Sequence, residues 1–310
     1  MAGILDSVNQ RTQLVGQNRL ELLLFKLPGK QRYGINVFKV REVLQCPSLT
    51  RMPKLHPCVR GVAHIRGQTI SVIDLSLATG GRPVEDPSKC FIIIAEYNRS
   101  PQGFLVDTVE RIVNINWEAM LPPPKGAGRV SYLTAVTEID KELVEIIDVE
   151  KILDEIAPRD VTVSATFLAD AADSVTGQRI LVADDSSVAR NQIKRALEPL
   201  GVEVMLAHDG KEALTMLRDM AKTAPNGKPD LALVISDVEM PEMDGYTLTA
   251  EIKSDANLRH LYVILHTSLS GVFNQAMVQK VGADDFIPKF NPDELAGAVR
   301  RAINQSLTGA

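Results

Sequence analysis

The sequence predicts two domains of different fold class, an all-β domain of short strands followed by an α/β domain with a five-stranded parallel sheet. The chain has 310 residues, which is more than one hydrophobic core usually serves. From Arg19 to about Asp148, short apolar runs alternate with turn residues, a pattern typical of a barrel or sandwich. From Arg179 onward, apolar strands alternate with helical segments, which predicts a parallel sheet covered by helices on both faces.

The domain boundaries follow from changes in this pattern. Loosely helical spacing of apolar residues over 4–15 predicts a short helix at the start of a first domain that spans 1–157. The helical segment VEKILDEIA, residues 149–157, closes that domain. Residues 158–178 are rich in Ala, Asp, Ser and Thr without periodicity and are predicted to form a linker. The second domain then occupies 179–310.

The composition is that of an ordinary globular protein. Hydrophobic residues make up 45% of the chain and charged residues 24%, outside the range of disordered or membrane-embedded proteins. The formal net charge is −5, whereas binding to nucleic acid or anionic lipid requires a basic excess. We therefore expect no nucleic acid partner and no direct membrane insertion.

The N-terminal residues and the cysteines indicate the compartment. MAGILDSVNQRTQLVGQ has charged and polar residues where a secretory signal needs an apolar run, and no segment reaches about 18 apolar residues. The chain has three cysteines without the C-x-x-C spacing of zinc or redox sites, namely Cys46, Cys58 and Cys90. These observations predict a cytoplasmic protein with reduced thiols.

Three carboxylates follow strands of the predicted parallel sheet. Asp184 and Asp185 end its first strand, and Asp237 ends its third. In this architecture ligands bind at the carboxyl ends of the strands. Clustered carboxylates repel one another, so they either take up protons or bind a cation. Oxygen ligands of this kind favour Mg²⁺, which keeps several waters and a position for a phosphate oxygen.

Two further strand ends complete a predicted site for phosphoryl transfer. The fourth strand ends in Thr267, whose hydroxyl is placed to hydrogen-bond a phosphoryl oxygen, and the fifth ends in Lys289, whose ammonium can pair with the same group. A metal, an ammonium and a hydroxyl around one nucleophilic carboxylate favour this chemistry. Asp237 is the predicted nucleophile because it lies on the central strand. Any one of these aspartates could instead be only a helix N-cap, as Asp185 could be, but the joint pattern favours the site.

The same segments resemble a known family. ILVADDSSVAR, LVISDVEMPEMDGY, ILHTS and DDFIPK are similar to the response-regulator receiver family of two-component signalling, over residues 179–305. The resemblance implies a flavodoxin-like fold and phosphorylation of Asp237 by a phosphohistidine on a kinase. It also implies that Mg²⁺ is bound by Asp184, Asp185, Asp237 and the backbone carbonyl of Glu239.

The receiver resemblance further implies a switch pair, in which the Thr267 hydroxyl moves toward the phosphate and the Phe286 ring follows it inward. For Phe286, ordinary core packing is the alternative. The sequence departs from the family at one position, because Phe290 follows Lys289 where the family usually has proline. The departure leaves the geometry of the last loop open, and it keeps the lysine's charge.

The first domain contains no recognisable catalytic constellation, and we expect no enzyme activity. Its histidines, His56 and His64, have no Ser, Cys or carboxylate at a spacing that suggests a triad or a metal site. CVRGVAHIRGQTISVIDL, together with ELLLFKL and RYGINVFKVREVL, resembles the CheW family of chemotaxis coupling proteins over residues 19–155.

The CheW resemblance implies two small five-stranded β-barrels around a shared core. It also implies an apolar groove where chemoreceptor tip helices and the regulatory domain of the histidine kinase CheA dock. Arg66 matches the family's arginine associated with this coupling, and its alternative is a solvated turn residue beside Gly67. Val37 and Val43 could line the groove or belong to the core.

The two resemblances in one chain are similar to the CheV family of chemotaxis scaffold proteins. This implies an adaptor at chemoreceptor arrays that couples receptors to CheA and is regulated by phosphorylation of Asp237. The alternative is a phosphate sink that drains CheA while the scaffold domain acts constitutively. A DNA-binding regulator is disfavoured because the chain stops at Ala310, directly after the last predicted helix. A methylesterase is disfavoured because no G-x-S-x-G motif occurs.

Overall fold

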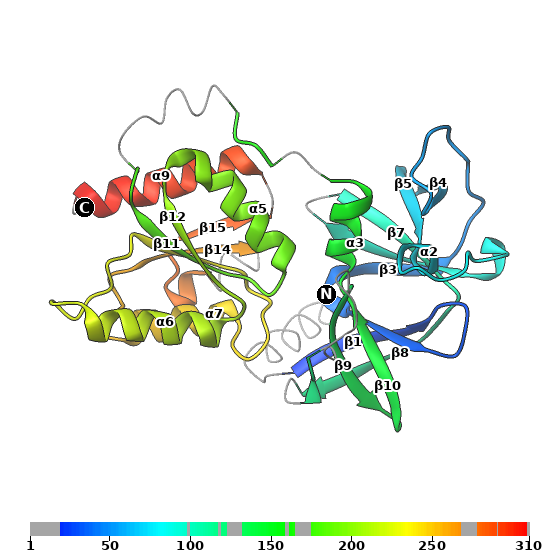
Figure 1. The fold of residues 1–310 in the computed structure, drawn as a ribbon, viewed down its shortest axis with the longest axis horizontal. Helices are drawn as coiled ribbons and strands as arrows, with labels where there is room; N and C mark the ends of the chain where they lie inside the picture. The colour runs from blue at the N-terminus through cyan, green and yellow to red at the C-terminus, as the bar shows by residue number, and fades with distance from the viewer. Residues whose placement is uncertain are drawn as a thin grey trace, which may run out of the picture. The chain divides into compact units, whose positions relative to one another are not determined.

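The described part of the chain forms two compact units, and Pro158 is the last residue of the first unit (Figure 1). The helix predicted at 4–15 and Phe290 lie outside the described residues. Among the residues that are described, no helix is both long and apolar enough to cross a membrane. The computed structural model describes residues 19–97, 100–116, 119–122, 132–158, 161–164, 175–267, 278–289 and 291–308.

The first unit is built from two five-stranded sheets, which confirms the predicted all-β class. The strand order of one sheet is β8-β1-β2-β10-β9, and that of the other is β3-β6-β7-β5-β4. The strands of the first sheet are β1 (Arg19–Lys26), β2 (Arg32–Asn36), β8 (Thr108–Asn116), β9 (Leu133–Ile139) and β10 (Glu142–Ile147). Those of the second sheet are β3 (Val40–Gln45), β4 (Val59–Ile65), β5 (Gln68–Asp74), β6 (Phe91–Tyr97) and β7 (Ser100–Val106).

Each of these sheets is closed by an isolated β-bridge between its two edges. Thr50, which follows the edge strand β3, pairs with Val62 of the opposite edge strand β4. Leu121, which follows β8, pairs with Val136 of β9 in the same way. Because the edges meet, few backbone groups remain open for strand addition by another chain. This closure is the geometry expected of two small barrels.

Strand β1 is buried on both faces. Leu22 and Leu24 belong to a core cluster that includes Val144, and the intervening Leu23 and the following Phe25 are buried as well. Because side chains alternate between the faces of a strand, continuous burial requires packing on both sides. The apolar run of β1 is therefore the sequence signature of an interior strand.

Short helices connect the strands of the first unit. The 3₁₀ helix η1 (Val37–Lys39) leads from β2 to β3, α2 (Leu75–Ala78) follows β5, and η2 (Pro87–Lys89) precedes β6. Helix α3 (Val149–Ile156) occupies the segment predicted to close the domain. It begins at Asp148, whose Oδ1 accepts a hydrogen bond of 3.0 Å from the backbone N–H of Lys151.

The second unit contains a five-stranded parallel sheet of order β12-β11-β13-β14-β15, which confirms the predicted α/β class. Its strands are β11 (Arg179–Ala183), β12 (Glu203–Ala207), β13 (Leu233–Ser236), β14 (Tyr262–Thr267) and β15 (Asp285–Pro288). Its helical segments are α5 (Ser187–Leu197), η4 (Glu198–Leu200), α6 (Gly210–Thr223), α7 (Gly245–Ser254) and α9 (Pro292–Thr308).

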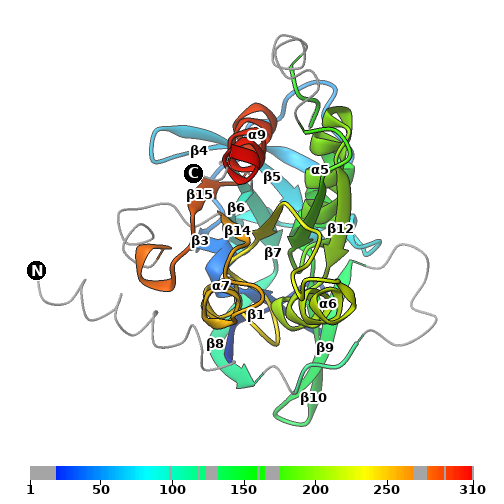
Figure 2. The ribbon, with the colours of Figure 1, turned by 90° about the vertical axis from the view of Figure 1, so that its left-hand side faces the viewer.

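The helices of the second unit cover both faces of its sheet. Ile193 of α5 and Val299 of α9 belong to one buried cluster, whereas Leu214 of α6 and Leu248 of α7 belong to another. Figure 2 shows α5 and α9 on one side of the sheet and α6 and α7 on the other. The strands read as continuous apolar runs because each is buried on both faces.

Part of the segment predicted as a linker packs into the second unit. Val163 and Val175 are 5% and 1% exposed and belong to the same buried cluster as α5 and α9. The backbone N–H of Ser164 donates a hydrogen bond of 2.8 Å to Oδ1 of Asp293 in the first turn of α9. These residues of the 158–178 range are thus part of the core of the second unit.

Candidate phosphoryl-acceptor site

The three predicted carboxylates meet at the carboxyl edge of the parallel sheet. Asp184 and Asp185 follow β11, and Asp237 follows the adjacent strand β13. The strand order reverses at this point, because the chain moves outward from β11 to β12 and from β13 to β14. The ligand oxygens of the three side chains lie within 4.8 Å of one another. Asp184 is fully buried, Asp237 nearly so, and Asp185 half-buried.

The side chain of Lys289 completes this cluster. Lys289 follows β15, and its Nζ lies 2.7 Å from Oδ2 of Asp184 and 2.8 Å from Oδ2 of Asp237. The lysine is 9% exposed. One ammonium thus faces three carboxylates in a largely buried place, where uncompensated charge is unfavourable. The site therefore has a deficit of positive charge.

The pKa of Asp237 reflects this deficit. Burial raises the pKa of its carboxyl, and the neighbouring Asp185 carboxylate raises it further, while the Lys289 ammonium lowers it. The net direction is upward, so the surroundings in the structure make ionisation of Asp237 less favourable than it is in water. A divalent cation beside the three oxygen donors would reverse this balance, and hard carboxylate ligands fit Mg²⁺.

Local hydrogen bonds fix the orientation of the two buried carboxylates. Oδ1 of Asp184 accepts from the backbone N–H of Ser186 at 2.9 Å, and Oδ1 of Asp237 accepts from the N–H of Val238 at 2.7 Å. Each aspartate therefore presents its Oδ2 to Lys289. The guanidinium of Arg190, one turn into α5, donates to the backbone carbonyl of Asp184. The start of α5 thereby holds the loop that carries Asp184.

The loop after Asp237 folds back tightly onto the strand end. The N–H of Gly245 donates to the carbonyl of Val238 at 2.9 Å, and the Ser236 hydroxyl donates to the carbonyl of Asp237 at 2.8 Å. A Cβ at Gly245 would lie 2.0 Å from the Asp237 carbonyl oxygen. The glycine of MPEMDG is therefore required by the close approach of two backbone segments. Glu239, whose carbonyl was predicted as a metal ligand, lies in this loop, and that role stays a prediction.

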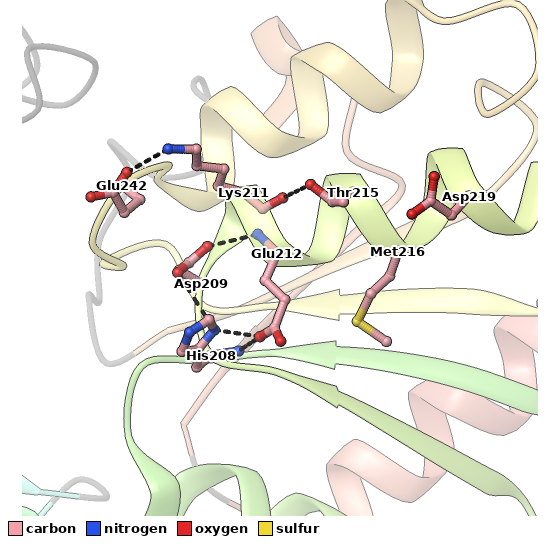
Figure 3. A pocket seen from close by; sticks show the side chains of 8 residues that line it. All are labelled: His208, Asp209, Lys211, Glu212, Thr215, Met216, Asp219 and Glu242. Carbon is pink, nitrogen blue, oxygen red and sulfur yellow. Dashed lines mark hydrogen bonds and ion pairs between the residues drawn. The ribbon is translucent and has the colours of Figure 1, made fainter.

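A separate polar cavity lies beside the same loop (Figure 3). It has a volume of about 630 Å³. Lys211 of α6 forms an ion pair of 2.9 Å with Glu242 of the loop, and the side chain of His208 contacts that of Glu212. Asp209 caps α6 by accepting from the N–H of Glu212 at 2.8 Å. The Lys211–Glu242 ion pair joins α6 to the loop, and the other two contacts hold the start of α6. The aspartate cluster does not line this cavity.

Thr267 and Phe286 lie near the cluster but in different surroundings. Thr267 ends β14 and is fully buried, and its carbonyl accepts from the N–H of Lys289 at 2.9 Å. Phe286 of β15 is half-buried and packs against an apolar cluster that includes Tyr246 and Leu265. The ring of Phe286 therefore packs against the core in this structure. A switch role for Thr267 and Phe286 stays a prediction.

His266 is a buried titratable residue of this region that sequence reasoning did not single out. It precedes Thr267 on β14 and is 1% exposed. Burial lowers its pKa to about 3, and the Lys289 ammonium acts in the same direction. The imidazole is therefore neutral at physiological pH. A histidine inside the apolar strand YVILHT, directly before a predicted site residue, was the available signal.

Arg66, the candidate partner-binding residue, lies in the first unit. It forms the two-residue turn between β4 and β5 with Gly67, with φ angles of 48° and 80°, as in a type I′ turn. Its side chain is 80% exposed, and its Nη2 lies 2.8 Å from Oε2 of Glu42 on β3. Val43, beside Glu42, is 38% exposed and thus does not belong to the core, and Val37 is half-buried.

Two family models match the chain in its two units. Residues 21–157 match the CheW-like domain, and residues 180–300 match the response regulator receiver domain. The two matches follow each other along the chain without overlap, and each falls on the unit whose fold class the sequence predicted.

Two relatives match nearly the whole chain. Chemotaxis protein CheV3 of Helicobacter pylori is 30% identical over 93% of this chain and 96% of its own length. Chemotaxis protein CheV1 of the same organism is 28% identical over 98% of this chain and 99% of its own length. The solved structure of the scaffolding protein TtCheW from Thermoanaerobacter tengcongensis is 25% identical and covers 46% of this chain and 91% of that one, with a TM-score of 0.40.

Proposed function

Because this chain belongs to the CheV family of chemotaxis proteins, we propose that phosphorylation of Asp237 regulates how its first unit couples chemoreceptors to the kinase CheA. Membership in the family makes the chain a non-enzymatic chemotaxis adaptor with a CheW-like coupling domain and a regulatory receiver domain. The proposal adds the phosphorylated residue, the groups that assist the transfer, and the partners.

The observation that supports the proposal is the convergence of three carboxylates and one ammonium at a single strand edge. The site has oxygen donors for one divalent cation, and Lys289 already lies within ion-pair distance of Asp184 and Asp237. Asp184, Asp185, Asp237 and the carbonyl of Glu239 would hold Mg²⁺. When bound, the cation neutralises the carboxylates and the charge on the incoming phosphoryl group.

The transfer itself requires little covalent chemistry from the protein. A carboxylate oxygen of Asp237 attacks the phosphorus of a phosphohistidine, the P–N bond breaks, and the imidazole nitrogen keeps the electron pair. The product is an acyl phosphate on Asp237. Lys289 pairs with a phosphoryl oxygen, and the Thr267 hydroxyl donates a hydrogen bond to another, so the protein acts by positioning and charge neutralisation.

The proposed partners are CheA and the cytoplasmic tips of chemoreceptors, which places the protein in the cytoplasm at receptor arrays. Arg66 is the proposed contact residue of the coupling domain. The turn that carries it is exposed and conformationally demanding, because Arg66 adopts a positive φ. A side chain held out on such a turn is accessible to a partner, unlike the backbone of the closed sheets.

A phosphotransfer assay tests the proposed acceptor. Full-length protein is mixed with radiolabelled phosphorylated CheA and Mg²⁺, and label on the chain is followed over time. We expect transfer to the wild type and none to Asp237→Ala, with Asp219→Ala on the exposed face of α6 as the matched control. Label on Asp237→Ala, or none on the wild type, would refute the assignment.

A second assay separates regulation from a phosphate sink. Kinase activity is measured in reconstituted receptor and CheA complexes containing the wild type or Asp237→Ala, with and without beryllofluoride as a phosphoryl mimic. Regulation predicts a change of activity with the mimic for the wild type alone. Unchanged activity and binding in all cases would favour the sink.

A further inference from the structure

Two of the three cysteines lie opposite each other on neighbouring strands of the first unit. The register of β3 with β6 places Gln45 opposite Phe91, so the next pair of residues is Cys46 and Cys90. The N–H of Cys46 donates a hydrogen bond of 2.9 Å to the carbonyl of Cys90, which extends the ladder by this pair. Directly opposed residues point to the same face of a sheet. The two thiol side chains therefore lie on one face.

That face is the interior of the small barrel. Cys46 and Cys90 are 6% and 4% exposed and belong to one buried apolar cluster. Both are free thiols in this structure. The thiol of Cys46 donates to the carbonyl of Pro47 at 3.4 Å, and the thiol of Cys90 donates to the carbonyl of Asp86 at 3.4 Å. Each thiol thus has a hydrogen-bond acceptor of its own in the reduced state.

The spacing of such an opposed pair suits a disulfide. Hydrogen-bonded partners in an antiparallel ladder have Cα atoms about 5.5 Å apart, and disulfides join Cα atoms that are about 4.4–6.8 Å apart. The Cβ atoms must approach by about 1 Å, from the spacing of opposed residues to that of a disulfide. The pair lies at the end of the ladder, because the N–H of Cys90 donates to the carbonyl of Pro87 instead of that of Cys46. The approach therefore has to move only the last pair of the ladder.

The electrostatic surroundings of the two thiols differ. Burial raises the pKa of Cys46, and the guanidinium of Arg60 opposes this increase. Burial raises the pKa of Cys90 to about 11, and the Asp107 carboxylate, whose Oδ1 lies 3.8 Å from the Cys90 Sγ, acts in the same direction. Because the thiolate is the reactive form, both thiols react slowly and Cys46 is the first to be oxidised. The pair is thus protected against brief exposure to an oxidant.

We propose that Cys46 and Cys90 form a reversible disulfide when the protein is exposed to hydrogen peroxide. The thiolate of Cys46 attacks one oxygen, the O–O bond breaks, and the departing hydroxide takes the proton that Cys46 released. The thiolate of Cys90 then attacks the sulfur of this sulfenic acid, the S–O bond breaks, and the second hydroxide takes the proton of Cys90. Two thiols and one peroxide give one disulfide and two waters. Peroxide is little larger than water, so a small local opening admits it.

The disulfide would close the part of the second sheet that carries Arg66 into a covalent loop. Residues 47–89 lie between the two cysteines and contain β4, β5 and the turn between them. Cys46 directly follows β3, the strand of Glu42, whose carboxylate pairs with Arg66. A cross-link at this point limits the opening of β3 away from β6. Oxidation would thereby hold Glu42 beside Arg66 and disfavour a partner that competes for the guanidinium. This last step rests on the proposed role of Arg66, whereas the disulfide does not.

Oxidation of the native full-length chain tests the pairing. The protein is treated with hydrogen peroxide, its remaining thiols are alkylated after denaturation, and its peptides are identified by mass spectrometry. We expect loss of the alkylated forms of Cys46 and Cys90, a cross-linked peptide that joins them, and full recovery with dithiothreitol. The chain unfolded in urea should give cross-links among all three cysteines. Native protein that forms no cross-link, or one to Cys58, would overturn the proposal.

Hydrogen exchange tests whether the cross-link restrains the strand. Peptides that cover Val40–Gln45 should exchange about tenfold more slowly in oxidised than in reduced wild type. The matched controls Cys46→Ala and Cys90→Ala each remove one sulfur of the pair, and their exchange should not respond to peroxide. Equal exchange in the two redox forms of the wild type would show that the disulfide does not hold β3.

A binding measurement separates this inference from the proposed function. Wild-type protein is oxidised, freed of peroxide, and titrated with CheA and receptor fragments. We expect binding about fivefold weaker than that of the reduced form, restored by dithiothreitol, and no such change for Cys90→Ala. If Arg66→Met binds as tightly as the wild type, the proposed role of Arg66 fails, while the cross-link and exchange still decide the disulfide. If Arg66→Met weakens binding and both redox forms bind equally, the effect of oxidation on coupling is refuted.

Discussion

In the second unit, the ammonium of Lys289 is buried between two carboxylates, whereas in the first unit the guanidinium of Arg66 extends into solvent beside Glu42. Both are ion pairs with N–O distances below 3 Å. Their exposure to solvent differs, and so does the free energy that it costs to break each pair. A buried pair is costly to break because its charges have no water to replace the partner. An exposed pair can exchange its partner at little cost. The first arrangement suits a chemical switch and the second suits docking.

The largest expected difference is in the free energy of unfolding of each unit after its cationic side chain, Lys289 or Arg66, is replaced. Lys289→Met leaves three clustered carboxylates without their ammonium, and we expect it to lower the free energy of unfolding of the second unit by about 3–5 kcal/mol without Mg²⁺. Arg66→Met should leave the stability of the first unit unchanged within error. Urea unfolding followed by hydrogen exchange distinguishes the units. Similar losses for both variants would contradict the contrast between the two pairs.

A glycine in each unit sharpens the comparison. Gly245→Ala places a Cβ 2.0 Å from the Asp237 carbonyl, and we expect a loss of about 3 kcal/mol or more, together with loss of phosphorylation. Gly67→Ala meets no atom within 4 Å but must keep a φ of +80°, which costs about 1–2 kcal/mol. Denaturant midpoints measure both. A smaller loss for Gly245→Ala would show that the loop after Asp237 can adapt.

Mg²⁺ should distinguish the units in a third way. At a concentration 100 times its dissociation constant, it should stabilise the second unit by about 2.7 kcal/mol and leave the first unchanged. The double variant Asp184→Asn, Asp185→Asn should lose this response. Thermal unfolding at graded Mg²⁺ concentrations measures the effect. Equal stabilisation of both units would show that the ion acts outside the carboxylate cluster.

The smallest effect is a pH dependence of the second unit. The pKa of His266 is about 3 in the folded chain, below its ordinary value of 6.5, so the unfolded chain binds a proton that the folded chain does not. Its contribution to stability is complete above pH 6.5 and decreases as the pH falls toward 3, by about 1.4 kcal/mol per pH unit. His266→Leu should remove this share of the slope between pH 6 and 5. An unchanged slope would show that the imidazole is protonated in the fold.

The sequence alone predicted the receiver fold and the convergence of its candidate site residues at one edge of the sheet. The carboxyl ends of parallel strands lie at one edge, so Asp184, Asp237 and Lys289 could be placed together from strand order alone. The two-sheet fold of the first domain was predicted from its short strands and from family motifs. The pairing of β1 with β8 and of β2 with β10 could not be derived from local pattern, because it joins distant segments.

Other features could not be predicted because they depend on tertiary contacts. The range 158–178 lacks periodicity, and nothing in TVSAT distinguishes a buried Val163 from a solvated one. The pair between Glu42 and Arg66 forms only when the edges of a closed sheet approach each other. For Phe286, the sequence could not distinguish core packing from the proposed switch role, because an aromatic ring at this half-buried position serves either.

The order in which the strands pair has a consequence for biosynthesis. Strand β1 is made first, yet its neighbours in the sheet include β8, and β2 lies next to β10, near the end of the domain. At about 5–20 residues per second, a ribosome needs of the order of 10 s to complete residues 27–147. During that time the leucine-rich β1 can pair only with β2 and lacks its other neighbour β8, so the nascent chain is exposed to aggregation and is a natural client for chaperones.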